Sequence, residues 1–146
     1  PDCIRALEVG QTIDIRNPRA VRPWQHVLEP LSGYMLLAQK MWNEPIKYCE
    51  GWNFGPKLES ISTVWEVATK IVEEYGDGEL KDMSNMNAAN LLMLDISKAK
   101  FQLGWEPRMN IDQCISLVID WYKKYVSQSV YSLCVEEIEK YLCFKS

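Results

Sequence analysis

The chain has 146 residues, of which 47% are hydrophobic and 25% charged, and its formal net charge at pH 7 is −4. The length suits one domain, and the composition is ordinary for a globular protein. The acidic balance argues against a general nucleic-acid binder, and no apolar run approaches the roughly 20 residues of a membrane-spanning helix.

The first third of the chain predicts a helix, a strand and a second helix. Residues 2–9 have a helical pattern that Gly10 ends, and the β-branched alternation of residues 12–16 predicts a short strand. Residues 17–24 contain two prolines and cannot be helical inside. A helix is then predicted from Leu28 to Trp42, with an apolar stripe formed by Leu28, Leu31, Tyr34, Met35, Ala38 and Met41.

The rest of the sequence alternates helices with single short strands. In chain order, the patterns predict a strand at Tyr48–Phe54, a helix at Ser60–Tyr75, a strand at Leu91–Leu94, a short helix from Asp95 to Lys100, a long helix capped by Asn110 with Gln113 in the reciprocal position, and a final helix near Val135–Leu142. Isolated short strands do not make a stable sheet. We therefore expect the chain, which begins without a methionine and inside a helical pattern, to be a fragment.

The five cysteines do not have the pattern of a disulfide scaffold or of a zinc site. They are odd in number, widely spaced and without a C-x-x-C pair, and the sequence has a single histidine, His26. Cys114 lies on the apolar face of its predicted helix, where a thiol acts as a small hydrophobic group. The sequence thus predicts reduced, structural cysteines and a cytoplasmic protein.

Three arginines fall close together with no acidic residue among them. Arg16, Arg19 and Arg22 lie on the proline-stiffened, non-helical segment, and Trp24 follows. A guanidinium group matches phosphate oxygens with two parallel hydrogen bonds, and an indole face can stack on a base or sugar. The residues alone favour a solvated basic loop slightly over a phosphate site.

The stretch from Ile15 to Leu36 resembles the signature region of CDP-glucose 4,6-dehydratases, in the extended short-chain dehydrogenase/reductase family. That family carries an R-D-(W/Y)-x-x-V pattern, which stands here as R-P-W-Q-H-V from Arg22 to Val27. Proline in place of the acid points to the CDP-glucose branch. The resemblance implies that Arg22 contacts the pyrophosphate of a nucleotide sugar. It also implies that His26 belongs to the entry of the following helix, in a packing or a substrate-adjacent role; the residues alone leave an acid or base role for His26 open.

Further motifs extend the resemblance to the end of the chain. They are Asn53-Phe54-Gly55-Pro56, then L-D-I-S-K-A from Leu94 and L-G-W-E-P-R from Leu103, and the tail from Tyr131 to Leu142. The resemblance implies an α/β fold in which this chain is the C-terminal substrate-binding portion, mostly helical with a few short strands, with the Rossmann half absent. Residues 28–56 would belong to the Rossmann sheet of the intact enzyme.

Two features depart from the family pattern. Before the L-D-I-S-K-A segment the family has His and Glu, whereas this chain has amides at Asn85, Asn87 and Asn90; this loop borders the substrate pocket in the family, so we include Asn87 among the substrate-binding residues. No glycine-rich dinucleotide turn occurs. A Tyr-x-x-x-Lys spacing occurs at Tyr141 and Lys145, where the family keeps no catalytic residue, and we assign it no catalytic role.

The resemblance implies an NAD-dependent parent enzyme that removes water from CDP-glucose to give CDP-4-keto-6-deoxyglucose. In this interpretation the chain supplies nucleotide-sugar binding through Arg16, Arg19, Arg22, Trp24 and Asn87, holds no catalytic or NAD-binding residue, and is inactive by itself. Two alternatives stay open: a non-catalytic nucleotide-sugar-binding or interaction module, and a fragment of another sugar-nucleotide epimerase or dehydratase. We also expect self-association, because the predicted second helix and strand would lack their partners.

Overall fold

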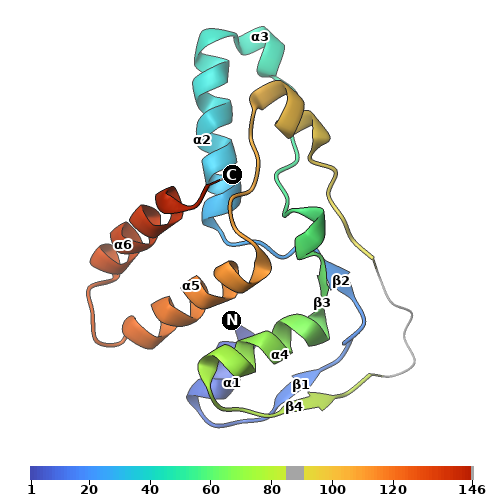
Figure 1. The fold of residues 1–146 in the computed structure, drawn as a ribbon, viewed down its shortest axis with the longest axis vertical. Coiled ribbons are helices and arrows are strands. Elements are labelled where there is room, and N and C mark those ends of the chain that lie inside the picture. The colour runs from blue at the N-terminus through green and yellow to red at the C-terminus, as the bar shows by residue number, and fades with distance from the viewer. Residues whose placement is uncertain (85–90, 146) are drawn as a thin grey trace.

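The computed structural model describes residues 1–84 and 91–145. Figure 1 shows the elements in space. In chain order they are α1 (Asp2–Glu8), β1 (Ile13–Ile15), β2 (Val21–Arg22), α2 (Leu28–Asn43), α3 (Pro45–Tyr48), η1 (Leu58–Ser60), β3 (Ser62–Thr63), α4 (Val64–Tyr75), β4 (Leu80–Asp82), η2 (Ala99–Leu103), α5 (Ile111–Lys124) and α6 (Val130–Cys143). Among the described helices, none combines the length and apolar character needed to cross a membrane.

The strands form two small pairs within the described residues. β1 runs parallel to β4, with Ile13 opposite Leu80, and β2 runs antiparallel to β3, with Val21 opposite Thr63. The predicted strand at residues 12–16 is therefore confirmed, and its partner comes from a segment that the sequence patterns did not identify. Figure 1 shows α1, α4 and α5 gathered around these strands in the lower part of the molecule.

The main hydrophobic core lies between β1 and these three helices. Apolar side chains of α4 and α5 face inward with helical periodicity and cover the β1 strand. The buried members are Ile4, Leu7, Ile13, Ile15, Val67, Ala68, Ile111, Ile115 and Ile119. This core unites the first residues of the chain with the penultimate helix.

Reciprocal capping boxes fix the starts of α4 and α5. Thr63 Oγ1 accepts from the Glu66 backbone N–H at 3.1 Å, and Asn110 Oδ1 accepts from the Gln113 backbone N–H at 2.9 Å. The Asn110 cap was predicted from the sequence and is confirmed. The predicted start of the earlier helix at Ser60 is wrong: η1 ends at Ser60, β3 follows at Ser62–Thr63, and the helix begins at Val64 with Thr63 as its N-cap.

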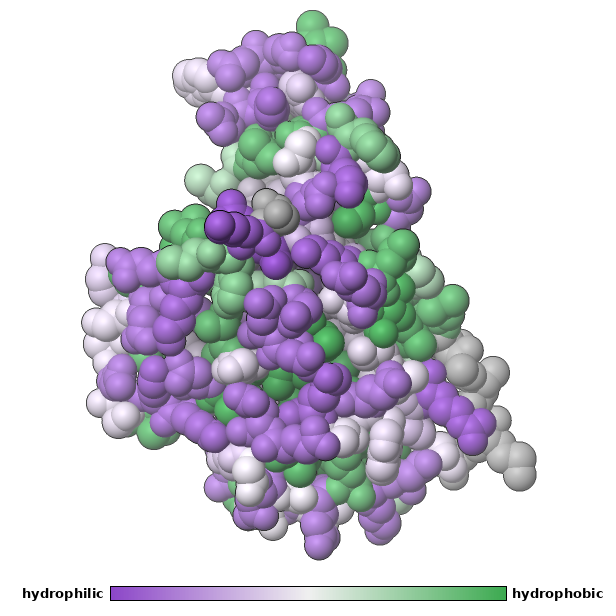
Figure 2. Space-filling model, viewed as in Figure 1, coloured by the Kyte–Doolittle hydropathy of each residue, from purple (hydrophilic) through white to green (hydrophobic). Residues whose placement is uncertain are grey.

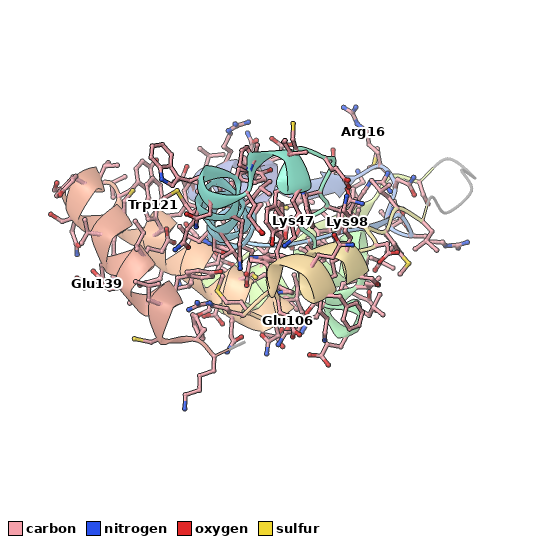
Figure 3. The ribbon with its side chains drawn as sticks, turned by 90° about the horizontal axis from the view of Figure 1, so that it is seen from above. Arg16, Lys47, Lys98, Glu106, Trp121 and Glu139 are labelled. Carbon is pink, nitrogen blue, oxygen red and sulfur yellow. The ribbon has the colours of Figure 1, made fainter. Side chains whose placement is uncertain are left out.

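The predicted strand at Tyr48–Phe54 is also wrong. Pro45 stands at the first helical position and starts α3, which ends at Tyr48, and the following residues have no regular structure. The Trp52 indole donates to the Tyr48 carbonyl at 3.0 Å, and no strand among the described residues lies beside this segment to pair with it. Lys98, labelled in Figure 3, pairs with Glu50 and holds the segment against the start of η2.

Two other predicted elements have different bounds. Within residues 91–94 only Leu91 forms an isolated bridge, to Val21, so the predicted strand there is reduced to one residue. The short helix predicted from Asp95 begins at Ser97 and continues as the π-helical turn η2. The final helix is longer than predicted at both ends and runs over residues 130–143.

Figure 2 shows apolar surface on the right of the molecule, beside residues 91–94.

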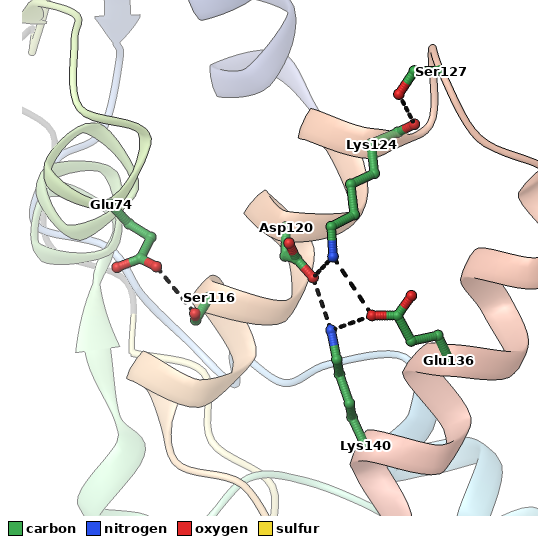
Figure 4. A network of polar contacts seen from close by, with 7 residues as sticks. All are labelled: Glu74, Ser116, Asp120, Lys124, Ser127, Glu136 and Lys140. Atoms are coloured by element: carbon green, nitrogen blue, oxygen red, sulfur yellow. Dashed lines mark hydrogen bonds and ion pairs between the residues drawn. The ribbon is translucent and has the colours of Figure 1, made fainter.

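A surface network joins α5 to α6, as Figure 4 shows. Asp120 Oδ2 lies 2.8 Å from Lys124 Nζ and 2.9 Å from Lys140 Nζ, and Lys140 is also 2.7 Å from Glu136. Hydrogen bonds from the two lysines lower the pKa of Asp120. Exposed pairs contribute little one at a time, so we expect each of these contacts to add little to the stability of the fold.

A buried carboxylate joins α2 to α6 and to the segment before α5. Glu29, which is 1% exposed, accepts through Oε1 from the backbone N–H groups of Arg108 (2.8 Å) and Met109 (2.7 Å). Its Oε2 accepts from the Tyr141 hydroxyl at 2.9 Å. Ser32, one turn along α2, accepts from the Trp105 indole at 2.9 Å. The first turns of α2 therefore anchor both α6 and the segment that precedes α5.

The raised pKa of Tyr141 predicts that the free energy of unfolding decreases at alkaline pH. Burial, with a contribution from nearby Glu29, raises its pKa from 10.0 to about 12, so the folded chain keeps a proton that the unfolded chain loses over this range. We expect this contribution to be complete below pH 10 and to be lost as the pH rises to about 12. Urea unfolding of the wild type and of Tyr141→Phe across this range tests it: the difference between the two free energies should shrink with pH, and parallel curves would contradict the prediction.

All five cysteines are free thiols. Cys114 is buried on α5 as predicted, and burial raises its pKa to about 11. Cys49, Cys134 and Cys143 are exposed, so packing does not explain them and the prediction that the cysteines are structural is wrong for these three.

Candidate functional site

A cleft of about 870 Å³ lies between α1, the strand β1 and the helices α4 and α5. Its floor is the apolar surface of the main core, including Ile13, Val67 and Ile115. Its polar wall comes from residues 14–26, the segment that runs from β1 through β2 toward α2. A concave, mostly apolar site with a few grouped polar side chains is the usual form of a small-molecule site.

Arg16 and Arg22 both line this cleft. Arg22 ends β2 and is half-buried, and its Nη1 donates to the Val21 carbonyl at 2.9 Å. Arg16 follows β1 directly and is exposed, and Figure 3 shows its side chain projecting away from the body of the chain. Two of the three predicted arginines therefore line the same cleft, and they differ in burial: Arg22 is half-buried, whereas Arg16 is exposed.

Arg19 is not part of the cleft lining. It is exposed on the turn in which the Ala20 N–H donates to the Asn17 carbonyl at 3.2 Å, between the two strands. Hydrogen bonds from Ser84, together with the charge of Arg19, lower the pKa of Asp82. The structure thus places Arg19 near β4 rather than beside the other two arginines.

Trp24 lines the cleft and also belongs to the fold. Its indole N–H donates to the Ser62 carbonyl at 3.0 Å, and its ring packs against the main core. The ring is half-buried, so one part of it faces the cleft while its polar atom is engaged. The predicted site residue Asn87 lies outside the described residues.

His26 is held by contacts on both ring nitrogens. It is buried; its Nδ1 accepts from the Leu28 N–H at 3.3 Å, and its Nε2 lies 3.4 Å from Glu137 Oε1 on α6. Burial lowers the pKa of His26 and raises that of Glu137. A neutral ring that accepts through Nδ1 carries its proton on Nε2, toward Glu137. These contacts suit the packing role implied by the resemblance better than proton transfer.

Gln25 is a cleft residue that the sequence did not identify. Its Nε2 donates to the Phe54 carbonyl at 2.9 Å, and its Oε1 is buried without a hydrogen-bond partner. The available signal was its place in the sequence, between Trp24 and His26 in the R-P-W-Q-H-V stretch. Glutamine alone carries no chemical signature, so composition could not single it out.

The described residues do not fit NAD. A dinucleotide fold needs glycines in the turn that leads from a strand into a helix, so that backbone N–H groups face the pyrophosphate. Here Gly10, Gly76 and Gly104 have left-handed backbones, but each follows the end of a helix. Tyr141 is no base either, since its raised pKa is the opposite of what its Tyr-x-x-x-Lys spacing would need.

The chain is 41% identical, over 97% of its length, to CDP-glucose 4,6-dehydratase of Salmonella typhimurium. The predicted resemblance to this family is confirmed. The chain covers 41% of the length of that dehydratase. No family model matches the sequence.

Solved structures confirm the predicted fold class. dTDP-glucose 4,6-dehydratase from Bacillus anthracis, solved with NAD, superposes with a TM-score of 0.71 at 20% identity, over 84% of this chain and 37% of that chain. UDP-glucuronic acid 4-epimerase from Bacillus cereus, solved with UDP-glucuronic acid and NAD, has a TM-score of 0.69 at 15% identity, over 85% of this chain and 39% of that chain. The chain thus has the fold of one portion of a short-chain sugar-nucleotide enzyme.

Proposed function

We propose that this chain supplies the nucleotide-sugar-binding part of a 4,6-dehydratase that converts CDP-glucose to CDP-4-keto-6-deoxyglucose. The observation that carries the proposal is that Arg16, Arg22 and Trp24 line one cleft. Guanidinium groups bind diphosphate oxygens bidentately, and the indole offers a flat face to a base or sugar. The identity to the Salmonella dehydratase supports CDP-glucose as the ligand.

NAD would be held by the portion of such an enzyme that this chain does not span, and the chain alone would be inactive. In such chemistry the protein orients cofactor and substrate, and these arginines would hold the diphosphate of the nucleotide sugar. We propose that residues 28–56 belong to the NAD-binding Rossmann portion of the intact enzyme. The free thiols are in keeping with a reducing compartment, and we propose the cytoplasm.

The outer face of α2 supports this arrangement. Leu31, Tyr34, Met35 and Trp42 are 45%, 56%, 74% and 89% exposed, and they recur at helical spacing. The polar and charged residues of the first turns, Glu29 among them, point inward instead. A helix with its apolar side toward solvent needs a further surface to cover it.

Calorimetric titration of the chain with CDP-glucose, CDP and UDP-glucose at low salt tests the binding role. We expect saturable heat with CDP-glucose, and about tenfold or greater weakening in Arg22→Ala, because a charge-assisted contact to phosphate is worth about 1.5–3 kcal/mol. Arg19→Ala is the matched control: it removes an arginine that the structure places off the cleft, and it should change the affinity less than twofold.

Equal weakening by the two variants would mean that binding follows general charge rather than this cleft. Absence of heat with every ligand would contradict a self-sufficient site in this chain.

A further inference from the structure

Gln25 has one amide atom fixed and the other unused. Its Nε2 donates to the Phe54 carbonyl at 2.9 Å, so exchanging the two amide atoms would set two acceptors against each other. Its Oε1 is therefore the free atom, and it is buried with no donor within the part of the chain that the structure describes. The orientation of this acceptor is set by the fold.

The neighbours of Gln25 do not share this property. The Trp24 indole N–H is engaged by Ser62, and both ring nitrogens of His26 have partners. Gln25 lines the same cleft as Arg22. Between these two residues the backbone N–H of Trp24 donates to the Arg22 carbonyl at 2.9 Å, which turns the chain. Gln25 thus belongs to the cleft lining together with Arg22, and its unused acceptor is buried.

A buried acceptor without a donor costs about 1–3 kcal/mol, and such groups are uncommon in native proteins. A bound molecule that donates a hydrogen bond to Gln25 Oε1 would explain why this atom has no partner among the described residues. Cytosine presents an exocyclic amino group, a donor, at the position where uracil presents a carbonyl oxygen, an acceptor. A fixed amide oxygen therefore accepts from the first base and repels the second.

We propose that Gln25 is a specificity-determining residue, whose Oε1 accepts from the amino group of a cytosine base in the cleft. The inference rests on the proposed function, because it assumes that the cleft holds a nucleotide. It adds the reason for preferring cytidine to uridine nucleotides. A site built around a hydrogen bond rejects a ligand that cannot make it, because the buried group is then left unpaired.

The test is the affinity of the chain for CDP and UDP, measured by calorimetry for the wild type and for Gln25→Met. We expect the wild type to prefer CDP by about tenfold or more, and the variant to lose that preference, because CDP loses an acceptor and UDP is no longer repelled. Gln102→Met is the control, since Gln102 is exposed on η2 and lies outside the cleft lining.

A second arm uses the wild type alone, so that it stands even if the variant does not fold. CDP whose cytosine amino group carries two methyl groups keeps the ring and the diphosphate but has no N–H to donate. We expect it to bind about tenfold more weakly than CDP. Binding of CDP and UDP with equal affinity, or of the dimethyl compound as tightly as CDP, would overturn the role of Gln25 alone. No binding of any diphosphate would overturn the proposed function and this inference together.

Discussion

Replacing Glu29 by alanine is expected to lower the free energy of unfolding by roughly 3–5 kcal/mol, because two backbone N–H groups and the Tyr141 hydroxyl lose a buried acceptor together. That is a large part of the 5–15 kcal/mol typical of a domain. Glu29→Gln keeps one carbonyl oxygen and the side-chain volume, so about half of this loss is expected. Urea unfolding followed by tryptophan fluorescence measures both changes.

Glu139→Gln is the matched control. Glu139 lies on the exposed side of α6, labelled in Figure 3, and substitution there should change stability by less than about 0.5 kcal/mol. If Glu29→Ala destabilised the chain no more than the control, α2 would not be the anchor of Arg108, Met109 and Tyr141 that the hydrogen bonds describe.

The chain in isolation is expected to self-associate through the outer face of α2. Met35→Glu combined with Trp42→Glu places two charges on this face, and we expect the pair to shift the chain toward monomer at micromolar concentration, because burying an unpaired charge in an apolar contact is costly. Sedimentation velocity over a range of concentrations measures the distribution of species.

Val126→Glu serves as the comparison for this experiment. Val126 is 75% exposed at the turn after α5, so the substitution adds a charge at an exposed apolar residue away from α2. It should leave the distribution of the wild type unchanged. A wild type that sediments as a single monomer at these concentrations would contradict self-association altogether.

The sequence predicted the elements that short-range patterns determine, such as helical periodicity and helix caps. Helical periodicity located α2, α4 and α5, and the Asn110 and Gln113 pair marked the start of α5. The failures came where tertiary contacts override local pattern. The aromatic-rich segment Tyr48–Phe54 resembles a strand in sequence, but among the described residues no neighbouring strand pairs with it, and α3 ends at Tyr48.

The candidate site divides in the same way. Residue type and the R-P-W-Q-H-V stretch led to Arg22 and Trp24, and the structure places both in the cleft. Arg19 has the same side chain as Arg22, so residue type cannot separate them. The turn between β1 and β2 carries Arg19 outside the cleft lining, and this turn is seen only in the structure. Gln25 could not be found from sequence, because its significance lies in an acceptor left unpaired by contacts far along the chain, such as that with Phe54.

The parallel pairing of β1 with β4 has a consequence for the order in which the cleft can be assembled. Ile13 faces Leu80 across the ladder, and the core beneath them joins Ile4 to Ile119. Contacts so distant in sequence carry a high loop-closure entropy and form late in folding. During synthesis Arg16 and Arg22 therefore leave the ribosome well before the floor beneath them can exist. Until β4 has emerged, β1 is an unpaired edge, and until α5 has emerged, its inner face lacks part of the core that covers it, so this is the interval in which the nascent chain is most exposed to misassociation.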